Sequence, residues 1–203
     1  MENYIKIRNQ KIELSEEQVQ KFLEGLETKN TKLSDIAVGD TFKIGKYEFI
    51  VLDRSRDTTA VIFKDLLYDS KPFGENNNYN DSNVDVLCHK FAEEIKGIIG
   101  EGNLVEHTVD LTSDDGLKDY GKIKRYMSLL TANAYRRYVE ILDKYKIAKW
   151  WWLATAYSTP KHENATWVKC VSPLGDIYGN NSCSSNDGVR PFCILNSNIF
   201  VSK

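Results

Sequence analysis

Three consecutive tryptophans, Trp150 to Trp152, constrain the fold of this chain more than any other feature. They lie in a run, Lys149–Thr155, that is typical of a strand, and side chains alternate between the two faces of a strand. Trp150 and Trp152 should therefore point one way and Trp151 the other. Because each tryptophan buries a large apolar area, we expect this strand to support a hydrophobic core on both faces.

Runs of β-branched and aromatic residues near both ends of the chain predict further strands. These runs are Phe42–Ile44, Tyr47–Leu52, Thr58–Phe63, Ala165–Val171, Asp176–Tyr178 and Val189–Leu195. Two central segments have the apolar spacing of a helix: Asn83–Lys96, capped by Ser82, and Ala132–Lys144, which starts after Thr131. Strands, two helices and strands again indicate an α+β fold built on antiparallel strands.

The first 30 residues predict a small unit of their own, with the order strand, strand, helix. Tyr4–Arg8 and Lys11–Leu14 alternate polar and apolar residues, as the two strands of a hairpin do. Ser15 followed by Gln18 has the spacing of a capping box at the start of a helix. The polar stretch Glu27–Lys32 predicts a linker, so we expect a ββα appendage over 1–30 and a main domain over 33–203.

Composition limits the partners of the protein. The 203 residues are 41% hydrophobic, which is enough for one domain with a core. Lys and Arg number 27 against 29 Asp and Glu, and this balance disfavours a nucleic-acid partner. No apolar run reaches the roughly 18–20 residues of a membrane span, and the opening MENYIKIRNQ lacks the apolar stretch of a signal peptide. We expect no membrane contact and a cytoplasmic location in the producing cell.

Catalytic and metal-binding motifs are sparse. The four cysteines, at positions 88, 170, 183 and 193, have no C-x-x-C spacing, and the three histidines are scattered. We therefore expect reduced, structural cysteines, no metal site and no cofactor. An enzyme with a cysteine or carboxylate site stays open as an alternative, because catalytic partners can be distant in sequence.

Several ordered motifs resemble those of the bacterial and phage domain-of-unknown-function family 6273. They are V-G-D-T-F-K-I-G-K-Y-E-F-I-V-L-D, Y-N-D-S-N-V-D-V-L-C-H-K-F, S-L-L-T-A-N-A-Y-R-R-Y, W-W-L-A-T and G-V-R-P. The last two span Trp151–Thr155 and Gly188–Pro191, and the resemblance covers about Leu33–Leu195. Ala154 stands where the family usually has arginine, and Asp85 where it often has one, which puts arginine-dependent roles there in doubt.

The family's ending is similar to that of C-type-lectin-like folds, including formylglycine-generating-enzyme-like domains and phage tropism proteins. In those folds a Trp-rich strand, a variable loop and a final strand form a small sheet that displays loops. The resemblance implies a fold, not an activity. The Glu-Pro-Asn calcium pattern of sugar-binding lectins and the closely spaced cysteine pair of formylglycine-generating enzymes are missing, so we expect neither a calcium lectin nor an oxidase.

We expect a non-enzymatic binding or display module of a phage or phage-derived element that contacts a protein or glycan, and a place on the virion stays open. A mobile-element protein that inhibits a host defence system is an alternative. The candidate ligand contacts lie in the polar segment Gly179–Gly188, although an ordinary solvated connection would also explain it. They are Asn180, Asn181, Ser184, Ser185, Asn186 and Asp187. The polar loop Gly74–Asn83 is the next place to look.

Overall fold

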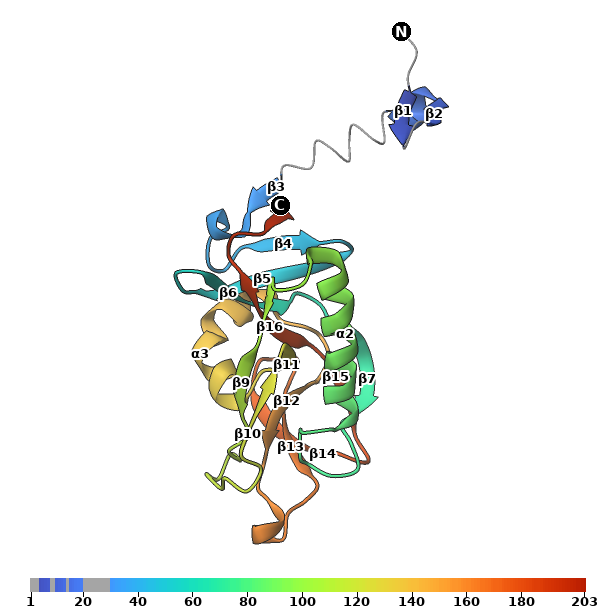
Figure 1. Ribbon diagram of the computed structural model, residues 1–203. Helices are drawn as coiled ribbons and strands as arrows, with labels where there is room; N and C mark the ends of the chain where they lie inside the picture. The colour runs from blue at the N-terminus through green and yellow to red at the C-terminus, as the bar shows by residue number, and fades with distance from the viewer. Residues whose placement is uncertain (1–3, 8–9, 14, 20–29) are drawn as a thin grey trace.

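The computed structural model describes residues 4–7, 10–13, 15–19 and 30–203 (Figure 1). The strands β1 (Tyr4–Ile7) and β2 (Gln10–Glu13) pair antiparallel, which confirms the predicted hairpin. The capping box is also present, because Ser15 N donates to Gln18 Oε1 at 2.9 Å and Gln18 N to Ser15 Oγ at 3.2 Å. Most of the predicted helix lies outside the described residues, so the ββα appendage stays a prediction.

The larger sheet brings the two ends of the main body together. Its eight strands are β3 (Asn30–Lys32), β4 (Thr41–Ile44), β5 (Tyr47–Arg54), β6 (Thr58–Phe63), β8 (Leu104–Val105), β11 (Met127–Leu129), β16 (Pro191–Asn196) and β17 (Phe200–Ser202). The order is β11-β16-β6-β5-β4-β17-β3, with β8 also on β16. The early strands and the strand after Arg190 therefore share one sheet. In contrast, Asn30–Lys32 was predicted to belong to a linker. These residues instead form the strand β3, because they pair with β17.

A second sheet contains the tryptophan strand. Its strands are β7 (Tyr68–Pro72), β12 (Trp151–Ala156), β13 (Trp167–Val171), β14 (Ile177–Asn181) and β15 (Asn186–Val189). The order is β14-β13-β12-β15-β7. The β12–β15 pair is parallel, whereas the other strand pairs among the described residues are antiparallel, as expected. A separate ribbon pairs β9 (His107–Asp110) with β10 (Lys122–Arg125).

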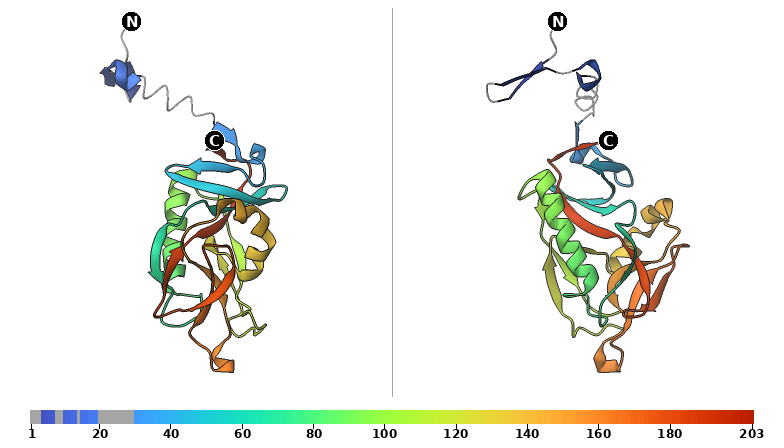
Figure 2. Two further views of the ribbon diagram at one scale, coloured as in Figure 1. Left: turned by 180° about the vertical axis from the view of Figure 1, so that it is seen from behind. Right: turned by 90° about the vertical axis from the view of Figure 1, so that its right-hand side faces the viewer.

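Two helices lie on opposite sides of the strands, as the three views agree (Figures 1 and 2). The helix α2 (Asn83–Ile99) starts where Ser82 accepts a hydrogen bond from Asp85 N, and α3 (Ala132–Leu142) where Thr131 accepts one from Ala134 N. Both caps lie where the sequence predicted the two helices to begin. Short 3-10 turns are η1 (Leu33–Asp35), η2 (Asp143–Tyr145) and η3 (Pro160–His162). No helix within the described residues is long and apolar enough to cross a membrane.

The strand β12 separates two hydrophobic cores. Trp152 belongs to the core that α2 covers, with Val168 and Val189. Trp151 belongs to the other core, with Tyr135 and Leu142 of α3. The predicted two-sided burial is therefore confirmed, and Trp152 and Val189 share one core.

Arg190, which lies in the chain between β15 and β16, is buried and donates to backbone carbonyl groups. Its Nε donates to Phe63 O at 2.9 Å and its Nη2 to Lys64 O at 2.8 Å. The guanidinium also lies 5.3 Å from the Trp151 ring centroid, within reach of a cation–π contact. Burial lowers the pKa of Arg190 to about 10, so the side chain stays charged at neutral pH.

Candidate functional site

The predicted ligand segment, Gly179–Gly188, is mostly strand rather than loop. The strand β14 continues to Asn181 and β15 begins at Asn186, so only residues 182–185 connect them. In the sheet order β13 and β12 lie between these two strands, yet Asn180 Nδ2 donates to Asp187 Oδ2 at 2.7 Å. The sheet therefore curls enough to bring the two strands together.

The six candidate side chains divide into two groups. Asn180 and Asp187 bond to each other, and Asn181 Oδ1 shapes the turn by accepting the N–H groups of Cys183 and Ser184 at 3.0 and 3.1 Å. Asp187 is buried, and burial raises its pKa. The side chains of Ser184, Ser185 and Asn186 lie at or near the surface and have no hydrogen-bond partner among the described residues. Their predicted ligand role stays a prediction.

Exposed aromatic side chains gather around β14, a feature that sequence analysis missed. Trp150 is 37% exposed, Tyr157 49%, Trp167 46% and Tyr178 52%. Such side chains usually bury their rings, so their clustering on one sheet edge is informative. The tryptophan content was visible in the sequence, but which rings stay open depends on packing that spacing does not report.

Two of these rings form the walls of an open cleft. The aromatic cleft, of about 380 Å³, is lined by Tyr157, Asn164, Trp167 and Gly179. A Cβ atom placed on Gly179 would lie 3.5 Å from Trp167 Cε3 and 3.6 Å from Tyr157 Cδ2. The missing side chain of this glycine therefore leaves the floor open between the two rings.

Amide groups border the cleft beside Trp167. Asn164 Oδ1 accepts the N–H groups of Thr166 and Trp167, at 3.3 and 3.1 Å. Asn181 lies directly opposite Trp167 in the β13–β14 register, so both side chains share one face of the sheet. The Nδ2 groups of Asn164 and Asn181 have no hydrogen-bond partner within the described part of the chain. Both can donate to a ligand.

An ion pair between the buried Lys169 and the more exposed Asp114 lies next to Tyr157. Lys169 Nζ is 5.2 Å from the Tyr157 ring centroid and 3.1 Å from Asp114 Oδ2. Asp114 also accepts Arg136 Nη2 at 2.9 Å. Although burial opposes it, the hydrogen bonds from Arg136 and Lys169 lower the pKa of Asp114. The charges next to the cleft are therefore already paired.

The asparagine-rich loop Gly74–Asn83 stabilises the backbone around the cleft through Asn77. Asn77 is fully buried, and its Nδ2 donates to the carbonyl oxygens of Ser158, Asn164 and Trp167 at 3.0, 3.2 and 3.1 Å. Its Oδ1 accepts the Tyr120 hydroxyl at 2.6 Å. One side chain thus ties together the segment that carries both aromatic walls.

Other polar residues near this loop also serve the fold. Asn80 Oδ1 and Asp85 both accept hydrogen bonds from Arg125, the latter at 2.7 Å from Nη2. Asp85, where the resemblance often expects arginine, is thus the buried partner of an arginine on β10. Ala154, the other departure, lies in the core beside Trp152. Neither position faces the aromatic cleft.

The three buried cysteines and Ser158 are not activated as nucleophiles. Burial raises the pKa of Cys88 and Cys170 to about 12 and also raises that of Cys193, so these thiols stay protonated at neutral pH. Ser158 Oγ donates to Asp115 Oδ2 at 2.6 Å, and His162 Nδ1 lies 3.0 Å from the same oxygen. The serine is therefore bonded to the carboxylate rather than to the histidine, unlike a serine nucleophile and its base. The described residues contain no cluster that could hold a metal ion.

A family model described as "Domain of unknown function (DUF6273)" matches residues 57–197. The chain belongs to the DUF6273 family. The match includes α2, α3 and the W-W-L-A-T and G-V-R-P segments, whereas β3, β4 and β5 precede it. No curated protein and no solved structure matches the chain at a significant level. For this DUF6273 domain, the geometry of the aromatic cleft is therefore the main indication of function.

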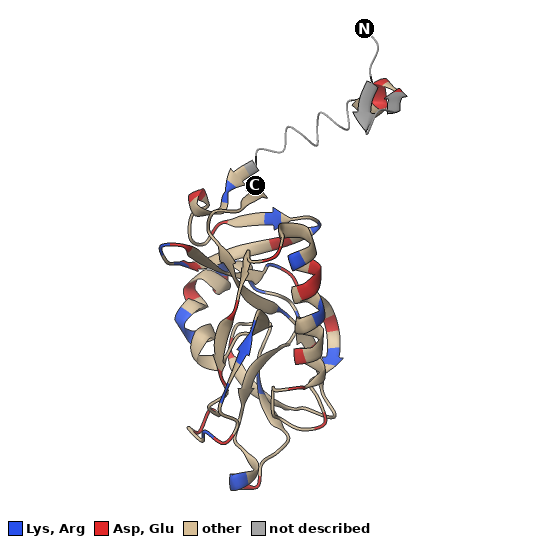
Figure 3. Cartoon of the chain, in the orientation of Figure 1, with Lys and Arg blue, Asp and Glu red and all other residues tan. Residues whose placement is uncertain are grey.

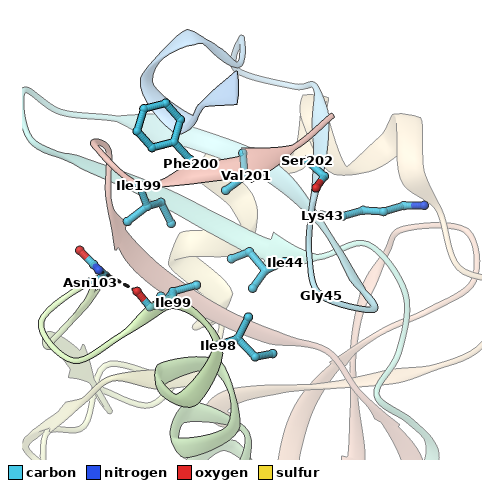
Figure 4. A pocket seen from close by; sticks show the side chains of 10 residues that line it. All are labelled: Lys43, Ile44, Gly45, Ile98, Ile99, Asn103, Ile199, Phe200, Val201 and Ser202. Atoms are coloured by element: carbon cyan, nitrogen blue, oxygen red, sulfur yellow. Dashed lines mark hydrogen bonds between the residues drawn. The ribbon is translucent and has the colours of Figure 1, made fainter. Parts of the chain in front are cut away.

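The DUF6273 protein has a second groove, at the end opposite the aromatic cleft. Isoleucines from β4, α2 and the turn before β17 point into a groove of about 300 Å³ that Phe200 borders (Figure 4). Asn103 also lines it, but its Nδ2 donates to Ile99 O at 2.8 Å. Acidic and basic residues are mixed over the elements of the domain (Figure 3). Of these surfaces, the aromatic cleft combines open rings with unpaired amide donors.

Proposed function

We propose that this DUF6273 protein is a non-enzymatic binding module whose partner contacts the aromatic cleft. One observation carries the proposal: Tyr157, just after β12, and Trp167, at the start of β13, stay about half exposed on either side of Gly179. Exposed aromatic area costs about 25 cal/mol per Å² relative to buried area, so it is informative when two such rings stay open together. Aromatic side chains on a rigid scaffold are typical of recognition sites.

The support beneath the cleft favours binding over chance exposure. Asn77 is fully buried and fixes the carbonyl groups of the wall segment before any partner arrives. A preformed site loses less conformational entropy when it binds, and therefore retains more of its contact energy. The buried, protonated thiols of Cys88 and Cys170 and the Ser158–Asp115 bond argue in the same direction, because none of these groups is prepared as a nucleophile.

The sequence resemblance is consistent with this proposal. C-type-lectin-like folds use a terminal sheet to present their contacts, and we propose that this domain does the same for a phage or phage-derived element. In this proposal the contact surface is the face of the β13–β14 pair, with the turn 182–185 at its border. Inhibition of a host defence system would be a special case of the same contact function.

The proposal is tested by binding to two arrays, one of bacterial glycans and one of bacterial surface proteins. The variants are Tyr157→Ala with Trp167→Ala in the cleft, and Phe200→Ala as the matched control, because Phe200 is an exposed aromatic residue far from the cleft. We expect the wild type and the control to bind and the cleft variant to lose at least about tenfold in affinity. Equal binding by the cleft variant, or no wild-type binding on either array, would contradict the proposal.

A further inference from the structure

We infer that the ligand of the aromatic cleft is a neutral sugar in its pyranose form, part of a glycan, stacked on Trp167 and Tyr157. This inference rests on the proposed function and adds the chemical class of the ligand. Its basis is the combination of two open rings, unpaired amide donors beside Trp167 and a neutralised charge environment. Each of these features excludes a different class of small ligand.

The charges beside the cleft disfavour an ionic ligand. Aromatic rings alone would suit a quaternary ammonium group, which binds over ring faces. Here the Lys169 ammonium already occupies one face of the Tyr157 ring, with its Nζ 5.2 Å from the ring centroid, so that face is not open to a second cation. An anion gains little from Lys169, because its ammonium is 3.1 Å from Asp114 Oδ2. A neutral ligand needs neither an open ring face for its charge nor an unpaired charge of opposite sign.

The rings and the amides together suit a pyranose. One face of such a sugar presents polarised C–H groups, which are attracted to the negative face of an aromatic ring, and its edge carries hydroxyl groups. Trp167 offers the ring, and Asn164 and Asn181 lie beside it with their Nδ2 groups unpaired within the described residues. Those groups can donate to hydroxyl oxygens. A purely apolar ligand would leave both donors unused.

The size and shape of the cleft agree with this assignment. A volume of about 380 Å³ lies within the range of roughly 300–1,000 Å³ that is typical of small-molecule sites. Gly179 at the floor lets a flat ring approach the strand between the two walls. The backbone of Gly179 does not require glycine, because its φ lies outside the left-handed region. Alanine can therefore replace it and narrow the floor without straining the strand.

The inference is tested by calorimetric titration of the full chain with short oligosaccharides. The neutral probes are cellotriose, maltotriose and chitotriose, and the matched charged probe is the deacetylated chitotriose, which carries amines on the same rings. We expect at least one neutral trisaccharide to bind. For the chitotriose pair, the deacetylated form should bind at least about fivefold more weakly than the acetylated one. Trp167→Ala should abolish neutral binding and Gly179→Ala should weaken it, whereas Trp167→Phe should retain part of it and Phe200→Ala all of it.

The outcomes separate the inference from the proposed function. If the cleft variants lose binding on the protein array while no neutral trisaccharide and no neutral glycan binds, the sugar assignment is wrong and the binding module stands. If a sugar binds equally well to Trp167→Ala, the sugar site is elsewhere and the inference is wrong. If neither array shows wild-type binding, both the inference and the proposed function are wrong. Circular dichroism of each variant excludes unfolding as the cause of a loss.

Discussion

Trp151 and Trp152 are consecutive in the chain, yet their side chains lie in different hydrophobic cores on opposite faces of β12. Trp152 also donates from Nε1 to Lys71 O at 2.8 Å, which joins β12 to β7 across the intervening β15. Trp151 instead packs its ring edge-on to Tyr135 of α3 and beneath the Arg190 guanidinium. One dipeptide thus connects both cores to the sheet that carries the aromatic cleft.

The two tryptophans should differ when each is replaced by phenylalanine. Trp152→Phe removes ring volume and leaves the Lys71 carbonyl without its donor, which costs about 1–3 kcal/mol beyond the packing loss. Trp151→Phe keeps an aromatic ring against Tyr135 and loses no such hydrogen bond. We expect Trp152→Phe to lower the free energy of unfolding by at least about 1 kcal/mol more than Trp151→Phe. Urea denaturation measures both, and equal losses would contradict this account.

Asn77 should act as a positioning residue for the aromatic cleft. Asn77→Asp keeps the size of the side chain but turns the donor toward three carbonyls into an acceptor, so we expect a loss of about 3 kcal/mol in stability. Tyr120→Phe is the matched control, because it removes only the bond to Asn77 Oδ1 and should cost about 1 kcal/mol. Hydrogen exchange should show faster opening of residues 158–167 in Asn77→Asp. Unchanged exchange there would show that Asn77 does not hold the segment.

Stability should fall in mild acid because of His107. Burial lowers the pKa of this side chain from 6.5 to about 4, so the unfolded chain takes up a proton below pH 6.5 that the folded protein refuses until about pH 4. The stabilisation is complete above pH 6.5 and is lost as the pH falls, by about 3 kcal/mol in total. His107→Gln removes the titrating group and should flatten this part of the stability profile. Asp110, whose pKa is lowered to about 2 by contacts with Thr112 and Lys122, loses its contribution only at lower pH.

Only one thiol should react in the folded protein. All four cysteines are free, three are buried, and Cys183 is exposed with its Sγ 2.8 Å from Glu75 O. We expect a thiol reagent to label one cysteine per chain under native conditions and four in denaturant, and Cys183→Ser to remove the native label. A mass increase on reduction would instead indicate a disulfide and contradict the free state of the cysteines.

The six predicted ligand residues should separate by their effect on stability. Asn181→Ala removes the acceptor for two turn N–H groups and should cost about 1 kcal/mol. Ser185→Ala with Asn186→Ala should change stability by less than about 0.5 kcal/mol, because neither side chain has a partner in the described residues. Thermal unfolding measures both. If the double variant is the less stable of the two, the turn is held differently from the structure shown here.

Local patterns predicted α2, α3 and about half of the strands, but not β7, β8, β9, β10, β11 or β17. Ser15, Ser82 and Thr131 occupy cap positions as expected, because a capping side chain bonds to an N–H only two or three residues away. The strands β4, β5 and β6 were predicted for a similar reason, since each has its own alternating or apolar run. The strand β3 was missed, because its polar residues Asn30–Lys32 are strand only through pairing with β17.

The site depended on contacts that no local pattern contains. Sequence analysis chose Asn180, Asn181 and Asp187 for their polarity, and the structure shows that internal hydrogen bonds account for them. It also overlooked Asn77, whose three acceptors lie more than eighty residues away in the chain. A hydrogen bond of this kind leaves no spacing signal, because its partners are adjacent only after the chain has folded.

The sequence by itself determined that Trp151 and Trp152 lie in a strand and that their rings face opposite ways, since this alternation follows from the backbone of any strand. It also determined the cap positions of the helices. Only the tertiary structure decided which aromatic rings are covered. Tyr157 and Trp167 are as apolar as their buried counterparts, but they stay 49% and 46% exposed in the folded chain, and Gly179 leaves the space between them open.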